Sequence, residues 1–159
     1  MTIKTGDSLP SCDLRKMVDG KMTTVSTDDV FAGKKVVMFA LPGAFTSTCS
    51  QKHVPGFQAN AAALYDKGFD LIACLSVNDI FVMDAWRESL GASEVEMLAD
   101  GNAEFTQAIG MEQDLTEAGM GIRSGRYAMV VEDMKVTLLN FDERGAFELS
   151  SAEAVLAAQ

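Results

Sequence analysis

The sequence predicts an α/β protein with a central mixed β-sheet flanked by helices. Two observations predict this fold class. Short runs of apolar, β-branched residues alternate with helical patterns along the first two thirds of the chain, and two further runs near the end are separated only by a turn. Strands joined through a helix form parallel β-α-β units, whereas strands joined by a tight turn pair antiparallel. We therefore expect a sheet with a parallel part and an antiparallel hairpin.

The first elements are an N-terminal extension and a buried strand. Residues 5–27 are polar and carry the turn signal Asp19-Gly20, so they predict an irregular hairpin. The run KVVMFA at residues 35–40 is β-branched and apolar, which is typical of a strand buried on both faces. The Leu-Pro-Gly tripeptide at 41–43 ends this strand.

A long helix is expected next, at residues 46–67. Thr46 or Ser47 can cap its start, and apolar residues recur at near-helical spacing from position 54 to position 65. Pro55 lies inside this pattern, where a proline removes one backbone hydrogen bond and favours a kink. We therefore expect a bend near Pro55.

The remaining elements continue the alternation. Asn78 or Asp79 can cap the helix that follows the second strand, and Gly91 can end it. The expected elements are strands at 69–77 and 95–98, helices at 79–90, 102–109 and 151–158, and a hairpin of strands at 126–132 and 135–141. This order matches a thioredoxin-like fold with an N-terminal extension.

Length and composition bound the kind of protein. With 159 residues, 48% of them hydrophobic, the chain suits a single domain spanning residues 1–159. No apolar run is long enough to span a bilayer, and the opening MTIKTGDSLP lacks the basic start and apolar stretch of a secretory signal. We therefore expect a cytoplasmic protein with no membrane partner.

Charge and metal-ligating residues exclude further classes. The formal net charge of −10 repels phosphate backbones, so we expect no nucleic-acid partner. The chain has three scattered cysteines, Cys12, Cys49 and Cys74, and one histidine, His53. This set fits neither a disulfide scaffold nor a zinc site, so we expect no metal and no cofactor.

The segment at residues 42–49, PGAFTSTC, carries the candidate chemistry. It follows a buried strand and opens a helix, so Cys49 should lie in or near the first helical turn. Unpaired backbone N–H groups and the helix dipole favour an anion there, and a thiolate is a strong nucleophile. Thr46 precedes Cys49 by three residues, so a hydroxyl stands where a Cys-x-x-Cys motif has its first cysteine. Thr46 could hydrogen-bond a thiolate or a peroxide oxygen, or act only as an N-cap.

These residues resemble a known family. PGAFTSTC contains the pattern P-x-x-x-T-x-x-C of the peroxiredoxins, and the longer segments LPGAFTSTCSQKHVPGF, ACLSVND, FVMDAW and RYAMVV are similar to the type II, or five-type, subgroup. The resemblance covers most of the chain, from about residue 6 to the C-terminal helix. It implies a thiol peroxidase that reduces hydrogen peroxide and organic hydroperoxides to water and alcohols.

The resemblance also implies residue roles. Cys49 matches the peroxidatic cysteine, which becomes a sulfenic acid, and Thr46 matches the threonine that hydrogen-bonds the peroxide. Pro42 matches the proline that shields the thiolate from water. Arg126 matches the arginine of the active site, where a permanently charged guanidinium could stabilise the thiolate and hold the peroxide. Without the resemblance, Arg126 would be interpreted as a surface charge at a strand start.

Other candidates stay open. Arg123 could add positive charge, and His53 lies one helical turn after Cys49, where it is either structural or a catalytic partner of a hydrolase-like Cys–His pair. Cys74 lies in an apolar strand, as an inert buried thiol or as a resolving partner, and Cys12 is interpreted as incidental.

The second half of the reaction depends on a missing residue. Animal-type members carry a resolving cysteine before the last helix, but residues 147–151 here read FELSS. We therefore expect an external thiol reductant, glutathione with glutaredoxin or else thioredoxin. A thiol–disulfide oxidoreductase and a redox sensor or holdase are the rival functions. The resemblance implies a homodimer, to which the apolar residues Phe45, Ile80 and Phe81 could contribute.

Overall fold

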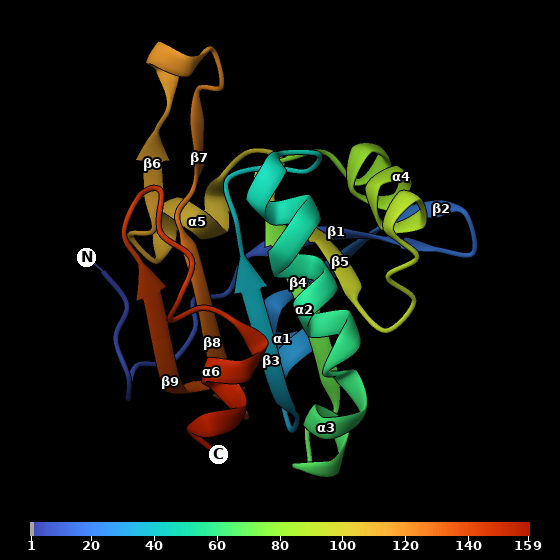
Figure 1. Ribbon diagram of the computed structural model, residues 1–159, viewed down its shortest axis with the longest axis vertical. Helices are drawn as coiled ribbons and strands as arrows, with labels where there is room; N and C mark the ends of the chain where they lie inside the picture. The colour runs from blue at the N-terminus through green and yellow to red at the C-terminus, as the bar shows by residue number, and fades with distance from the viewer. Residues whose placement is uncertain (1) are drawn as a thin grey trace.

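A seven-stranded mixed sheet runs through the computed structural model, which describes residues 2–159 (Figure 1). Its strands are β1 (Asp13–Val18), β2 (Lys21–Ser26), β3 (Lys35–Ala40), β4 (Leu71–Ser76), β5 (Glu96–Ala99), β8 (Arg126–Glu132) and β9 (Lys135–Asp142). They lie in the order β2-β1-β5-β4-β3-β8-β9. β3 pairs parallel with β4 and β4 with β5, whereas β8 is antiparallel to both β3 and β9. The predicted mixed sheet is confirmed.

The central strands are apolar because both of their faces are covered. In β3, Val37 and Phe39 belong to the hydrophobic cluster on one face of the sheet, and Val36 and Met38 belong to the cluster on the other. Successive side chains of a strand point to opposite faces, so a strand covered on both sides must be apolar at every position.

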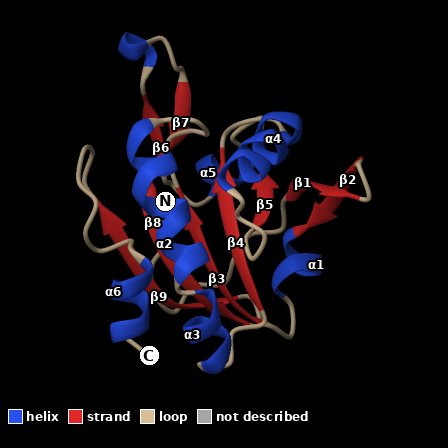
Figure 2. Cartoon of the chain, turned by 45° about the vertical axis from the view of Figure 1, so that its right-hand side comes forward, coloured by secondary structure: helices blue, strands red, loops and turns tan. Residues whose placement is uncertain are grey.

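Helices form the two outer layers (Figure 2). Those that supply residues to the first cluster are α2 (Val54–Ala59), α3 (Ala61–Asp66), α4 (Ile80–Leu90) and α6 (Ala152–Ala157). The helices α1 (Thr27–Phe31) and α5 (Glu104–Ala108) supply residues to the second. Among residues 2–159, none of the helices combines the length and the apolar character that crossing a membrane requires.

Local signals in the sequence place several element ends correctly. Asp79 caps α4 by accepting a hydrogen bond from the Val82 backbone N–H, and Gly91 ends α4 in the left-handed conformation. The N-terminal hairpin of β1 and β2 turns at Asp19-Gly20, where both residues have positive φ. The type I′ turn that such a pair favours matches the twist of the two strands.

The expected long helix at 46–67 is instead three consecutive segments. A π-helical turn, η1 (Cys49–His53), precedes α2, and the interruption between α2 and α3 lies at Asn60 rather than at Pro55. Pro55 is the second residue of α2, but α2 continues directly from η1, so Pro55 lies inside a helical segment that begins at Ser47. The segment departs from α-helical geometry in η1, directly before Pro55, and the bend expected near Pro55 stays a prediction. Thr46 stands directly before this helical segment, and its carbonyl accepts a hydrogen bond from the Ser50 N–H at 2.9 Å, while its Oγ1 donates to the Gly43 carbonyl.

A second, small hairpin was not predicted. It consists of β6 (Glu112–Asp114) and β7 (Ile122–Ser124), with the 3₁₀ turn η2 (Thr116–Ala118) between them. In Figure 1 this hairpin projects beyond the end of the main sheet, next to the start of α2. Its strands have three residues each and lack an apolar run. An alternation of apolar and polar residues cannot be recognised over so few positions.

Candidate active site

Cys49 lies at the carboxyl end of β3, inside the first turn of the helical segment that begins at Ser47. Its side chain is fully buried. The loop before it is fixed by Asn78, whose Oδ1 accepts hydrogen bonds from the Ala44 backbone N–H at 3.0 Å and from the Ser76 hydroxyl at 2.7 Å. Cys49 thus occupies the position in an α/β sheet where ligands usually bind, beyond the carboxyl ends of the parallel strands.

Arg126 reaches Cys49 because β8 runs antiparallel to β3. Ala40, the last residue of β3, pairs with Tyr127, so the start of β8 lies beside the loop that leads to Cys49. The Nη2 atom of Arg126 donates a hydrogen bond to Cys49 Sγ at 3.2 Å. A guanidinium keeps its charge at any working pH, so Arg126 presents a permanent positive charge and an N–H donor to the sulfur.

His53 completes the contacts of Arg126. Its Nδ1 lies 2.9 Å from Arg126 Nη1, and its Nε2 lies 3.0 Å from the Ser150 carbonyl oxygen. Arg126 can only donate and a carbonyl can only accept, so His53 must carry its proton on Nε2 and accept through Nδ1. Burial, together with the charge of Arg126, lowers the pKa of His53 to about 3. The ring is therefore neutral and engaged on both sides, so it orients Arg126 and cannot act as the base of a hydrolase-like pair.

Pro42 and Thr46 line a cavity of about 310 Å³ together with Arg126. Because Thr46 Oγ1 donates its proton to the Gly43 carbonyl at 2.7 Å, its lone pairs remain available to accept a hydrogen bond from a ligand O–H. Cys49, Thr46, Pro42 and Arg126, the four residues proposed from the sequence, are thus brought together.

The cavity walls come from segments far apart in the sequence. Leu115, Ala118 and Met120 of the β6–β7 hairpin form an apolar wall, and residues 143–146, which follow β9 and include two charged side chains, form a second wall. An apolar wall beside the guanidinium suits a ligand with a polar peroxide end and an alkyl end. Sequence reasoning missed these wall residues. The glycines at 119 and 121 are a turn signal that could have indicated the hairpin.

Arg123 does not line this cavity. Its Nε donates to the Met120 carbonyl at 2.8 Å, and its Nη1 comes so near Gly43 that a Cβ at that position would lie 3.2 Å away. Arg123 therefore holds the tip of the hairpin against the loop before Cys49, and Gly43 allows this close approach.

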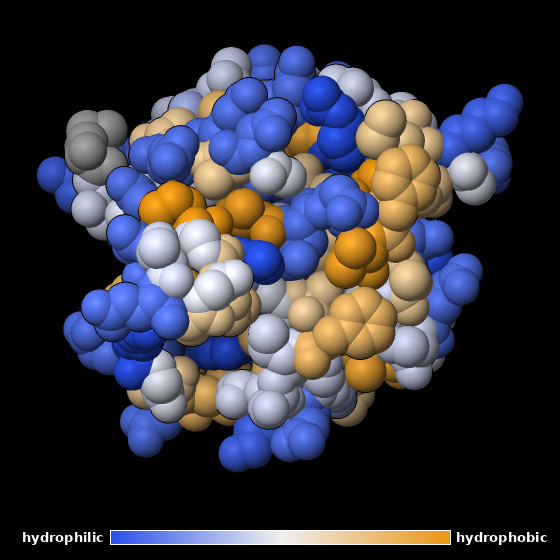
Figure 3. Space-filling view, turned by 90° about the horizontal axis from the view of Figure 1, so that it is seen from above, coloured by the Kyte–Doolittle hydropathy of each residue, from blue (hydrophilic) through white to orange (hydrophobic). Residues whose placement is uncertain are grey.

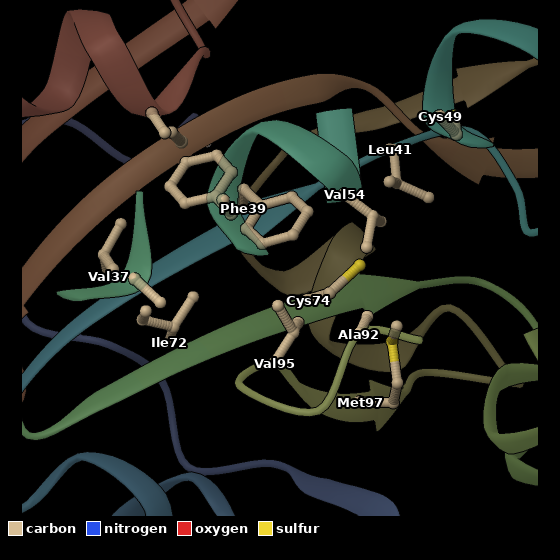
Figure 4. Packing of buried hydrophobic residues seen from close by; sticks show 14 of the residues in the cluster. Val37, Phe39, Leu41, Cys49, Val54, Ile72, Cys74, Ala92, Val95 and Met97 are labelled. Carbon is tan, nitrogen blue, oxygen red and sulfur yellow. The ribbon is translucent and has the colours of Figure 1, made fainter. Parts of the chain in front are cut away.

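The other two cysteines are apart from this chemistry. Cys49 and Cys74 belong to the same hydrophobic cluster; in Figure 4 the Cys74 sulfur lies beside Val54, and Cys49 lies past Leu41 at the upper right. Burial raises the pKa of the Cys74 thiol well above its usual range, so this thiol stays protonated at neutral pH. Cys12 is half-buried, and burial followed by the nearby Asp100 raises its pKa as well.

Comparisons with known proteins identify the family of the chain. The family model described as Redoxin matches residues 4–156, so the chain belongs to the redoxin family. Peroxiredoxin-2E-2, chloroplastic, from Oryza sativa subsp. japonica is 52% identical over 163 residues, which cover 99% of this chain and 72% of that protein. Peroxiredoxin-2E, chloroplastic, from Arabidopsis thaliana is also 52% identical, over 99% of this chain and 69% of its own length.

A solved structure gives the same result. Reduced Prx3 from Vibrio vulnificus in complex with hydrogen peroxide is 48% identical, with a TM-score of 0.96 over 99% of each chain. Within the redoxins, this chain is therefore a peroxiredoxin of the type II group and a thiol peroxidase, with the thioredoxin-like fold that the sequence predicted.

Proposed function

We propose that Cys49 is the peroxidatic cysteine and that Thr46, Pro42 and Arg126 serve it directly. The observation that carries this proposal is the hydrogen bond from Arg126 Nη2 to Cys49 Sγ, because Arg126 also lines a cavity together with Thr46 and Pro42. Arg126 stabilises the thiolate and can bind the peroxide oxygens. Thr46 accepts a hydrogen bond from the peroxide O–H, and Pro42 keeps water away from the sulfur.

The reaction is a displacement on oxygen. The Cys49 thiolate attacks the terminal oxygen of the hydroperoxide, an S–O bond forms as the O–O bond breaks, and the sulfur is oxidised to sulfenic acid. The electron pair leaves on an alkoxide or hydroxide, which takes up a proton to give an alcohol or water. Donors fixed around the oxygens stabilise the charge as it moves from sulfur to the leaving group. Hydrogen peroxide and organic hydroperoxides are both substrates in this proposal, the latter because of the apolar wall.

An external thiol completes the cycle. Ser150 occupies the region where animal-type members carry a resolving cysteine, and Cys74 is enclosed in the core. The sulfenic acid is therefore reduced by a small thiol such as glutathione, with glutaredoxin resolving the mixed disulfide; thioredoxin is the alternative reductant.

The proposal is tested with cysteine variants and mass spectrometry. Cys49→Ser should abolish peroxide consumption, whereas Cys12→Ser and Cys74→Ala should leave it within about twofold, because both thiols lie outside the cavity. In the wild-type protein, peroxide followed by glutathione should give a glutathione adduct on Cys49. Turnover by Cys49→Ser would refute the peroxidatic role, and a disulfide between Cys49 and Cys74 would refute the external reductant.

Dimer formation and location are further parts of the proposal. Phe45 and Phe81 are 58% and 61% exposed, and two large aromatic side chains left in solvent favour burial against a second copy of the chain. Figure 3 shows hydrophobic patches on this end of the molecule. Ile80, which the sequence suggested as a third contributor, is 1% exposed and belongs to the core, so that expectation is wrong. A single domain over residues 1–159 and a cytoplasmic location remain predictions; the two plant relatives are named as chloroplastic.

A further inference from the structure

Asp142, the last residue of β9, is a buried carboxylate engaged by one short segment of chain. It is 3% exposed and takes part in none of the ion pairs among residues 2–159. Its Oδ2 accepts hydrogen bonds from the Glu148 N–H at 3.1 Å, the Ser150 N–H at 2.9 Å and the Ser150 hydroxyl at 2.6 Å, and its Oδ1 accepts from the Leu149 N–H at 2.9 Å.

These four donors compensate the cost of burying the charge. Burial acts to raise the pKa of Asp142, but the hydrogen bonds from Ser150, Leu149 and Glu148 outweigh it and lower the pKa. Residues 148–150 belong to no helix or strand. Their position therefore depends on Asp142 more than on regular backbone hydrogen bonds.

The segment held by Asp142 leads directly to the sulfur. The Ser150 carbonyl accepts the Nε2 proton of His53 at 3.0 Å, which leaves Nδ1 to accept from Arg126 Nη1 at 2.9 Å. The other terminal nitrogen of the same guanidinium is then directed at Cys49 Sγ, at 3.2 Å. Each link fixes the donor or acceptor role of the next, since the proton on His53 can occupy only one nitrogen in the neutral ring.

We propose that Asp142 is a positioning residue: through the Ser150 carbonyl and His53, it holds Arg126 in the orientation that stabilises the Cys49 thiolate. The inference rests on the proposed role of Cys49 and adds a function for two residues, Asp142 and Ser150, that do not contact the sulfur. The mechanism resembles the outer partners of a metal-bound histidine, which set its tautomer and ring orientation.

Two simpler explanations predict different results. If Asp142 only stabilises the fold, its replacement lowers the melting temperature without changing the reactivity of Cys49. If Asp142 acts only through its negative charge, its removal favours the thiolate and makes Cys49 react faster. If Asp142 positions Arg126, its replacement makes Cys49 react more slowly. A decrease in the rate therefore indicates positioning, and an increase indicates an effect of charge alone.

The test is Asp142→Asn, a change of one atom type. An amide has one acceptor oxygen, so in either orientation its NH₂ faces a backbone N–H and part of the hold on residues 148–150 is lost. Alkylation of Cys49 by iodoacetamide at pH 7, followed on the Cys49 peptide by mass spectrometry, and the second-order rate with hydrogen peroxide should both fall about 10- to 100-fold. The matched control is Asp133→Asn, because Asp133 also accepts a backbone hydrogen bond, from Gly33 at 2.7 Å, but on an exposed turn without contact to the site.

The tautomer of His53 gives a second measurement, which should not change if Asp142 only stabilises the fold. It is the single histidine of the chain, so one set of imidazole signals appears in a ¹⁵N NMR spectrum. The wild-type protein and Asp133→Asn should show the Nε2–H tautomer alone. Asp142→Asn should show a mixture of tautomers or a ring that takes up a proton between pH 5 and 7.

A double-mutant cycle tests the route. If Asp142 acts through His53, then Asp142→Asn should slow Cys49 little further in a His53→Gln background. Additive effects of the two substitutions on the rate of Cys49 would contradict the proposed route through His53. A folded Asp142→Asn protein whose Cys49 reacts as fast as in the wild type, or faster, would also contradict it. Ser150→Ala, which removes only the hydroxyl, is the milder variant should Asp142→Asn fail to fold; an unchanged rate and an unchanged tautomer in it would overturn the proposal. Failure of the wild-type protein to consume peroxide would instead refute the proposed function, because the alkylation and NMR readouts do not require turnover.

Discussion

At the scale of single residues, the site depends on one guanidinium that makes two different contacts. Arg126 donates from one nitrogen to Cys49 Sγ and from another to His53 Nδ1. A neutral imidazole accepts the second donor without adding positive charge beside the first. A protonated imidazole would have no free lone pair and would repel Arg126. The neutrality of His53 is therefore part of the electrostatics of the site, and it has a consequence for stability.

The free energy of unfolding should decrease when the pH falls from 7 to 5, because of His53. In the folded chain the pKa of His53 is about 3, against 6.5 for an ordinary histidine, so the unfolded chain binds one more proton between these values. Stability is then complete above pH 6.5 and is lost as the pH falls below it, by about 2 kcal/mol at pH 5. Urea unfolding at pH 7, 6 and 5 measures this change.

The control for this prediction is His53→Gln, which has no titrating ring. Its free energy of unfolding should change little over the same range, although its absolute value should be lower. Asp142 contributes in the same direction only at lower pH, because its pKa lies below the ordinary value of 3.8. Equal pH dependence in the two proteins would show that His53 takes up its proton in the folded state.

At the scale of elements, the β6–β7 hairpin forms a wall of the cavity. Leu115, Ala118 and Met120 line it, while Ile122 of the same hairpin is exposed and does not. The hairpin packs against the loop before Cys49 at Gly43, where the absence of a Cβ lets the side chains of Arg123 and Met120 approach closely. This arrangement places apolar surface next to the peroxide site without contributing to the reaction itself.

Met120→Ala should therefore discriminate between substrates. A large apolar substrate such as cumene hydroperoxide loses contact area, so its kcat/KM should fall about 5- to 20-fold, whereas the value for hydrogen peroxide should change less than about twofold. Steady-state kinetics with both peroxides measures the ratio. Ile122→Ala, on the solvent side of the same hairpin, should leave both values unchanged. An equal loss for both peroxides in Met120→Ala would mean that the hairpin acts on Cys49 rather than on the substrate.

The elements also show how far sequence reasoning reaches. The buried strands were predictable because every position of KVVMFA is apolar, and the ends of α4 were predictable because Asp79 and Gly91 have strong local preferences. The π-helical turn at Cys49 and the break at Asn60 were not predicted, because the apolar spacing from position 54 to position 65 indicates a single helix. In the site, the motif identified Cys49 and Arg126. Asp142 escaped notice because three of its four hydrogen-bond donors are backbone N–H groups, which have no sequence signature.

At the scale of the whole molecule, the chain leaves two aromatic side chains uncovered near the site. Phe81 lies in the first turn of α4, and the ring of Phe45 is 6.4 Å from that of Trp86 in the same helix. Phe45 also has a φ of +64°, an uncommon conformation for a residue with a bulky side chain. Such backbone strain is retained where the surroundings or a function require it.

Phe81→Ser should therefore shift the protein from dimer toward monomer. If a second copy buries Phe81, the substitution removes about 2 kcal/mol of apolar burial from each of two symmetric contacts, enough to raise the dimer dissociation constant several hundredfold. Multi-angle light scattering across a micromolar concentration series measures the mass, with Tyr65→Ala as control, because Tyr65 is a partly exposed aromatic residue on α3, at the opposite end of the helical layer (Figure 1). The melting temperature of Phe81→Ser at monomeric concentrations should stay near that of Tyr65→Ala, since Phe81 packs little within its own chain. A wild-type protein that is monomeric at every concentration would contradict the dimer, and an unchanged dimer in Phe81→Ser would place its interface elsewhere on the molecule.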